Sequence, residues 1–426
     1  MRDKEQPGSR RPAGFTHPTP VATALAWIDK HVSPLEVALA PLIGAAGRVL
    51  AEPVAAAADV PPFTRAAVDG IAVRAEETLG ASAYNPLSFR LLTTCEALPT
   101  VGAARVNAGA LLPGGADAVV PLEQVSLDTG DTCEIIDPVV PGIGVERAGS
   151  HAVRGAILLP TGRRLRPHDI GLLASAGVAR VPVVGRPEVR VVITGRSLSP
   201  PEAPSSSGAI CDADGPLLRA LIERDGGTLA DLRYTNRDRA ALRDALAAPG
   251  PDIVLVVGGT GNGAHDVAAA ALAEAGTLAI HGMALCPGDS AGMGRVGASL
   301  PVFLLPGAPA ACLWAYEFFA GRAIRRFAGR HPMLPFRSQE RRTMRKIVSR
   351  IGMTEVRPVR CQDDASVEPI VSFDELGLMA AARADGFVII PEGSEGFAEG
   401  ATVAAYLYDE HDGLSGPLFE EPGCRP

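Results

Sequence analysis

A five-residue segment in which every residue is apolar, Ile253–Val257, runs directly into the glycine-rich segment Gly258–Gly263. A strand that is apolar at every position is typical of a parallel sheet covered on both faces. A predicted helix, Asp266–Ala275, follows, and the same order recurs where Val302–Leu305 leads into Pro306–Pro309 and a further helix. Two such strand–turn–helix units predict a doubly wound α/β domain with right-handed crossovers.

The α/β pattern begins at Pro187. Its other predicted strands and helices are Val189–Ile193, Gly215–Asp225, Thr228–Tyr234 and Asn236–Ala247. In a sheet of this kind, ligands bind beyond the carboxyl ends of the parallel strands. The glycine-rich turns are therefore where a ligand is expected.

The turn Gly258–Gly263 is suited to an anion, because exposed N–H groups before a helix favour phosphate. It carries neither the P-loop ending nor the dinucleotide-binding fingerprint. The turn Pro306–Pro309 places a second helix start at the end of a strand. Asp212 and Asp214 either cap a third helix or bind the ligand, and Asp266 either complements a helix dipole or belongs to the site.

The chain before Pro187 does not show the alternation of apolar strands and helices seen after it. Val21–His31 has helical spacing, and Val37–Ala51 is compatible with a loop or a second short helix. Short apolar pieces between Gly and Pro over Val60–Pro141 predict a small inserted β domain. Further expected elements are strands at Ile157–Arg166 and Val178–Val184 and a helix at Pro167–Ala176.

The end of the chain predicts a separate β-rich module over Arg341–Tyr408. The basic run Arg337–Arg350 is interpreted as a solvated linker into its first strand, in preference to a binding patch. Residues 1–20 are polar and rich in proline, which predicts a disordered tail.

Composition narrows the classes of function. A length of 426 residues is enough for about three domains. The 40 Lys plus Arg residues are outnumbered by 48 Asp plus Glu residues, and this acidic balance argues against a nucleic-acid binder. Only Lys4, Lys30 and Lys346 are lysines, so a phosphate site must rely on backbone groups or on arginine. The seven cysteines form no C-x-x-C pair, which predicts neither a zinc site nor a disulfide framework. The sequence shows neither a membrane span nor a signal pattern, and a cytoplasmic location is expected.

The H-E-x-x-H motif of zinc-dependent proteases is missing from the sequence. The eight histidines show no H-E-x-x-H spacing. Asp69, in an Asp-Gly turn, is either structural or part of a metal or oxyanion site. The residues by themselves predict a multidomain α/β protein that binds a phosphorylated small ligand.

Five segments, in order over about 250 residues, resemble motifs of the MoeA/gephyrin family of molybdopterin molybdenumtransferases. They are Pro62–Arg74, Pro113–Glu123, Arg164–Gly177, Gly258–Asp266 and Leu305–Pro309. The correspondence runs from about Val21 to Tyr408, nearly the whole chain.

The resemblance implies a multidomain α/β plus β fold. Its doubly wound MoaB/MogA-like molybdopterin-binding α/β domain is expected beside a discontinuous linker domain, an inserted β domain and a C-terminal β-barrel. The implied divisions are a tail at 1–20, the linker domain at 21–58 and 142–186, the inserted domain at 59–141, the α/β domain at 187–335, the barrel at 336–410 and a tail at 411–426. It also implies a homodimer whose active site lies between the α/β domain of one subunit and the inserted domain of the other.

The implied reaction is hydrolysis of adenylylated molybdopterin with release of AMP and insertion of molybdate, assisted by Mg²⁺. The resemblance assigns catalysis to Asp69, Glu123 and Asp266, with Asp69 and Asp266 also holding the metal. It assigns ligand binding to Asp212, Gly258, Gly259, Thr260, Gly263, Pro306, Gly307 and Pro309. Molybdoenzymes or other cofactor-synthesis proteins are candidate partners.

The chain also departs from the family pattern. The family's K-P-G-K-P loop reads Cys286–Ser290 here, so both lysines are missing and Asp289 replaces one of them. Arg196, Arg295 and His151 are the candidates to compensate. The departures favour an alternative, a catalytically impaired member that acts as a molybdopterin carrier or a molybdoenzyme assembly factor.

Overall fold

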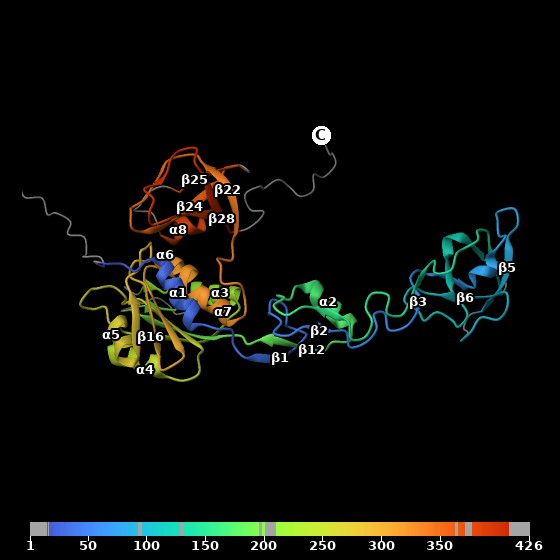
Figure 1. The fold of residues 1–426 in the computed structure, drawn as a ribbon, viewed down its shortest axis with the longest axis horizontal. Helices are drawn as coiled ribbons and strands as arrows, with labels where there is room; N and C mark the ends of the chain where they lie inside the picture. The colour runs from blue at the N-terminus through green and yellow to red at the C-terminus, as the bar shows by residue number, and fades with distance from the viewer. Residues whose placement is uncertain are drawn as a thin grey trace, which may run out of the picture. The chain divides into compact units, whose positions relative to one another are not determined.

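The computed structural model describes residues 15, 17–92, 96–127, 131–195, 198–200, 210–362, 365–370 and 377–408. The chain divides into two compact units, Val37–Val183 and the remainder (Figure 1). The predicted tail 411–426 and most of the predicted tail 1–20 lie outside the described residues. None of the described helices is long and apolar enough to cross a membrane.

The second unit is built around a six-stranded sheet with the order β16-β13-β17-β21-β20-β18. The strands are β13 (Glu188–Thr194), β16 (Thr228–Thr235), β17 (Ile253–Val257), β18 (Thr277–His281), β20 (Gly292–Val296) and β21 (Leu300–Leu305). The first four in the sheet are parallel, as predicted, and β20 and β18 extend the sheet antiparallel. The doubly wound arrangement places the carboxyl ends of β13, β17 and β21 next to one another.

Helices cover both faces of this sheet, which explains why β17 is apolar throughout. Ile253, Leu255 and Val257 pack into one core, and Val254 and Val256 pack into the core on the opposite face. The helices of the first face are α1 (Val21–His31), α3 (Asp214–Asp225), α6 (Pro309–Ala315), the π-helical turn η3 (Tyr316–Ala320) and α7 (Gly321–Phe327). Those of the second are α4 (Arg239–Ala247) and α5 (Ala268–Ala275).

The C-terminal part of the same unit is a closed β-barrel, because β26 pairs with both β24 and β28. Its strands are β22 (Arg337–Thr343), β24 (Thr354–Cys361), β25 (Ser366–Pro369), β26 (Gly386–Ile390) and β28 (Thr402–Leu407). The additional strand β19 (Leu285–Cys286) pairs with β24, and the smaller elements are β23 (Ile347–Val348), β27 (Gly396–Phe397) and α8 (Leu378–Ala382).

The interpretation of Arg337–Arg350 as a solvated linker is wrong. Its first half is strand β22, which pairs with β28 from Arg337 to Arg342. Charged side chains do not prevent this pairing, because a barrel strand exposes alternate residues to solvent. The buried positions of β22 are Arg341 and Thr343.

The unit Val37–Val183 contains a small helical and β part and a six-stranded sheet with the order β7-β4-β6-β5-β9-β8. The sheet strands are β4 (Gly70–Val73), β5 (Leu87–Leu92), β6 (Gly102–Val106), β7 (Ala118–Pro121), β8 (Val125–Leu127) and β9 (Thr132–Ile135), with short 3₁₀ turns η1 (Ala75–Thr78) and η2 (Leu122–Gln124). The other elements are β1 (Val37–Pro41), β2 (Val54–Ala55), β3 (Arg65–Ala66), β10 (Val145–Glu146), β11 (Ile157–Leu159), α2 (Pro167–Ser175) and β12 (Arg180–Val184).

Val37–Ala51 contains no second helix, and the loop alternative holds only for its later part, since residues 42–51 form turns and isolated bridges. It begins with β1, which pairs with β12, a strand from the far end of the unit. Leu42 and Leu50 then join the core cluster around Leu173. The domain divisions at 58, 141 and 186 stay predictions.

Candidate functional site

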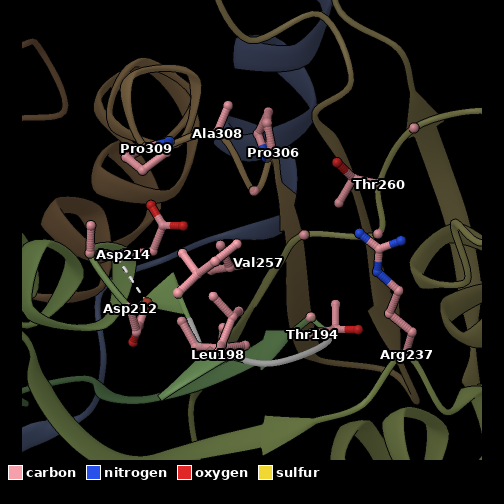
Figure 2. Close-up of a pocket in the computed structure, with 18 of the residues that line it drawn as sticks. Thr194, Leu198, Asp212, Asp214, Arg237, Val257, Thr260, Pro306, Ala308 and Pro309 are labelled. Carbon is pink, nitrogen blue, oxygen red and sulfur yellow. Dashed lines mark hydrogen bonds between the residues drawn. The ribbon is translucent and has the colours of Figure 1, made fainter. Parts of the chain in front are cut away.

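A pocket of about 500 Å³ lies at the carboxyl ends of β13, β17 and β21, where the sheet topology predicted a ligand (Figure 2). Its described lining includes Thr194, Gly195, Asp212, Asp214, Arg237, Gly258, Gly259, Thr260, Gly261, Asp266, Ser290, Pro306, Gly307, Ala308 and Pro309. Residues predicted from the two glycine-containing turns are thus brought together. Gly263 does not line the pocket but contributes to the geometry of the first turn.

The two turns touch each other through glycine. Gly258 has φ +82°, and a Cβ on it would lie 2.5 Å from the backbone oxygen of Thr194. A Cβ on Gly307 would lie 3.0 Å from the Cα of Gly258, and Gly258 N donates to Leu305 O at 2.9 Å. The close approach of neighbouring strand ends therefore requires glycine at both positions.

Asp266 closes the first turn on itself. Its Oδ2 accepts a hydrogen bond from Gly263 N at 2.8 Å. Helix α5 begins only at Ala268, with Val267 as its N-cap residue, so Asp266 precedes the cap. The carboxylate is half-buried and lines the pocket, which keeps it available to a ligand at that wall.

Asp212 confirms the capping interpretation. Its Oδ1 accepts from Asp214 N at 3.0 Å and from Gly215 N at 3.2 Å, at the start of α3. Its Oδ2 accepts from the Tyr234 hydroxyl at 2.8 Å. Three donors surround a carboxylate whose residue is only 3% exposed. Asp212 fixes the helix and at the same time forms part of the pocket wall.

Asp214, the first residue of α3, differs from Asp212 in its hydrogen bonding. It is 6% exposed, and within the described part of the chain its Oδ1 has no hydrogen-bond partner. Burial and the neighbouring carboxylate of Asp212 raise the pKa of Asp214 to about 7, while the Cys312 thiol donates to its carboxyl group and lowers the pKa. The pocket therefore contains a carboxyl group that holds its proton to near-neutral pH.

The lysine-free loop Cys286–Ser290 contributes one residue to the described pocket lining. Ser290 lines the pocket and lies 3.2 Å from Thr260, hydroxyl to hydroxyl. Cys286 belongs instead to β19, and Arg350 Nη2 lies 3.6 Å from its sulfur. Asp289 does not line the pocket.

None of the three predicted compensating residues is found in the described lining. Arg295 is on β20 and donates to Ala298 O at 3.3 Å. His151 lies in the other compact unit, where its backbone N–H donates to Val60 O at 2.9 Å. Arg196 lies outside the described residues. The described lining contains one arginine, Arg237, which the sequence analysis missed.

Asp69 and Glu123 are brought together, but in the unit Val37–Val183. Asp69 precedes β4 and Glu123 lies in η2 after β7, and these strands pair with Gly70 opposite Pro121. Both residues are exposed. Asp69 Oδ1 accepts from Ala108 N at 2.7 Å, so the aspartate has the structural role expected of an Asp-Gly turn. Its catalytic role stays a prediction.

Within the part of the chain that the structure describes, no group of three or more His, Cys, Asp or Glu residues is placed to hold a metal. Mg²⁺ commonly needs fewer protein ligands, because it binds one or two carboxylates together with substrate phosphates and water. Asp266, beside a turn suited to phosphate, fits this mode of binding.

The fold and the site define a multidomain α/β protein whose ligand pocket lies at adjoining glycine turns of a doubly wound sheet. Three family models match it: the MoeA N-terminal region (domain I and II) over 19–177, a probable molybdopterin binding domain over 190–326 and the MoeA C-terminal region (domain IV) over 340–408. The chain belongs to the MoeA family, as its motifs indicated.

The chain is similar to known relatives over most of its length. Molybdopterin molybdenumtransferase 2 of Mycobacterium tuberculosis is 34% identical over 319 residues, which are 70% of this chain and 77% of the relative. Molybdopterin molybdenumtransferase of Staphylococcus aureus is 28% identical over 409 residues, 92% of this chain and 96% of the relative. Two structures of the MoeA protein from Pyrococcus horikoshii have TM-scores of 0.73 and 0.71 at 30% and 28% identity, each covering 92% of this chain and 100% of theirs.

These comparisons confirm the predicted fold class and place the chain in molybdenum cofactor biosynthesis. They do not favour the alternative of an impaired carrier or assembly factor. The loop that motivated this alternative contributes only Ser290 to the described pocket lining.

Proposed function

We propose that this chain is a molybdopterin molybdenumtransferase, which hydrolyses adenylylated molybdopterin, releases AMP and inserts molybdate. The observation that carries the proposal is the pocket at the two glycine turns, in a chain that matches the MoeA models from residue 19 to residue 408. A volume of about 500 Å³ suits a small ligand.

The chemistry required of the pocket is modest. Hydrolysis of the phosphoanhydride consumes one water molecule and yields AMP and the phosphate ester of molybdopterin, whose dithiolene sulfurs take the metal. The turn Gly258–Gly263 would hold phosphate oxygens through backbone N–H groups. Asp266 would hold Mg²⁺ at this wall, and Asp69 is proposed as the second carboxylate. When bound, the ion would offset negative charge on the phosphate oxygens.

Asp69 and Glu123 complete the proposal. Their shared edge, at the ends of β4 and β7, would meet the molybdate, with a second copy of the chain supplying the pocket. A homodimer of this kind explains why two groups of site residues lie in two compact units of one chain. The reaction is proposed to take place in the cytoplasm.

Release of AMP tests the proposal. Purified chain is incubated with adenylylated molybdopterin, Mg²⁺ and molybdate, and AMP is quantified by liquid chromatography. Asp266→Ala is expected to lose most of the activity, while Asp244→Ala, at an exposed position on α4, keeps it. AMP release no higher than in a protein-free control contradicts the proposal.

A further inference from the structure

Arg237 occupies an unusual place in the backbone. It lies between the end of β16 and the start of α4, and its φ of +55° is in the left-handed region that residues with a Cβ rarely adopt. Asp238, which follows it, caps α4 by accepting from Ala240 N at 2.9 Å. Such a conformation is strained in the free chain and is typical of residues held in place for a ligand.

The side chain of Arg237 also lacks a partner among the residues that the structure describes. No hydrogen bond or ion pair among the described residues involves its guanidinium, and its Nε is buried without a partner. Other arginines of the same domain are paired, such as Arg190 with Asp231 and Arg325 with Asp225. A buried N–H group without a partner is costly unless a ligand completes it.

A second unpartnered group lies in the same part of the pocket. Thr194 is 3% exposed, and its Oγ1 has no hydrogen-bond partner among the described residues. A Cβ on Gly259 would lie 3.8 Å from that oxygen, so the hydroxyl group is beside the glycine-rich turn. Figure 2 shows Arg237 pointing toward Thr260, with Asp212 and Asp214 on the opposite side of the pocket.

Arg237 and the Thr194 hydroxyl therefore lie beside the glycine-rich turn that Asp266 closes, across the pocket from Asp212 and Asp214. We propose that Arg237 is the phosphate-binding residue of this pocket and that it binds a phosphate or diphosphate group together with the Thr194 hydroxyl and the turn at Gly259. A planar guanidinium suits this task, because it donates two parallel hydrogen bonds to phosphate oxygens. The identity of the complete ligand rests on the proposed function, whereas the anion site does not.

Calorimetric titration with inorganic pyrophosphate tests the inference at fixed ionic strength. Arg237→Gln is expected to weaken pyrophosphate binding by about tenfold or more, and Thr194→Val by a smaller factor. The matched control is Arg239→Gln, which removes the same charge two residues away, from an exposed arginine paired with Glu274 outside the pocket. Its dissociation constant should equal that of the unmodified chain.

Arg237→Gly separates binding from folding. Glycine adopts a φ of +55° without strain, so this variant should melt no lower than the unmodified chain while losing pyrophosphate binding. Equal binding by Arg237→Gln and the unmodified chain overturns the inference, as does an unmodified chain that fails to bind millimolar pyrophosphate. Arginine-dependent pyrophosphate binding without AMP release would instead refute the proposed transferase and leave the anion site standing.

Discussion

The buried carboxyl group of Asp214 makes stability depend on pH. Its side chain is enclosed beside Asp212, and none of the described residues forms a hydrogen bond with its Oδ1. Replacement by asparagine keeps the shape of the side chain and removes its titration. Asp214→Asn therefore isolates the cost of ionising this carboxyl group inside the folded α/β domain.

The magnitude follows from the shift in pKa. The pKa of Asp214 rises from its ordinary 3.8 to about 7, and about three pKa units at about 1.4 kcal/mol each correspond to about 4 kcal/mol. Between these two values the folded state holds a proton that the unfolded state has released. The contribution of Asp214 to stability is therefore largest at low pH, falls as pH rises through this window, and levels off above about pH 7.

Urea unfolding followed by tryptophan fluorescence measures the effect. Both tryptophans, Trp27 and Trp314, pack in the core of the α/β domain, so the signal reports the domain that contains Asp214. At pH 8.5, Asp214→Asn should be more stable than the unmodified chain by about 2–4 kcal/mol. At pH 5, which is only about one unit above the ordinary pKa, the difference should shrink to about 1–2 kcal/mol.

The control is Asp244→Asn, at an exposed position on α4. Its stability relative to the unmodified chain should change with pH by only a few tenths of a kcal/mol. A difference between Asp214→Asn and the unmodified chain that is the same at pH 5 and pH 8.5 refutes the reasoning. So does a variant that is less stable at pH 8.5.

Three further predictions concern packing, assembly and the buried ion pairs. Gly307→Ala places a methyl group 3.0 Å from the Cα of Gly258. Urea unfolding should show a loss of stability of about 1–3 kcal/mol, and calorimetry should show weaker pyrophosphate binding. Unchanged binding contradicts this prediction. If two subunits share each active site, inactive Asp69→Ala and Asp266→Ala chains that are mixed after reversible dissociation should regain about a quarter of the AMP-release activity. The reason is that about half of the random dimers are mixed, and each mixed dimer has one intact site of its two. No restored activity argues against the shared site. Arg325→Met removes the 2.8 Å partner of the buried Asp225, which keeps Arg224 at 2.9 Å, and should cost about 1–3 kcal/mol in urea unfolding; an unchanged stability is inconsistent with that pair.

Strong local patterns made much of the α/β domain predictable. The range Ile253–Val257 is the same in prediction and structure, because both faces of that strand need apolar residues. Helix α4 begins at Arg239, after the Asp238 cap, and not at the predicted Asn236. The strand Gly292–Val296 was not predicted, since its two glycines weaken the usual strand signal.

The site could be predicted only where the chain itself carries the signal. Glycine turns after apolar strands identified one wall of the pocket. The importance of Arg237 depends on a left-handed backbone angle and on a missing partner, and neither has a signature in composition. An arginine just before an aspartate cap, at the end of a parallel strand, is the one local pattern that marks it. The protonated state of Asp214 likewise depends on burial against Asp212.

A structure of the chain with bound adenylylated molybdopterin tests the central claim most directly. The account predicts that a phosphate group lies within hydrogen-bond distance of the N–H groups of Gly258–Gly263 and of the Arg237 guanidinium, with Asp266 at the same wall. A ligand bound elsewhere, or one whose phosphate groups contact neither the turn nor Arg237, would contradict it.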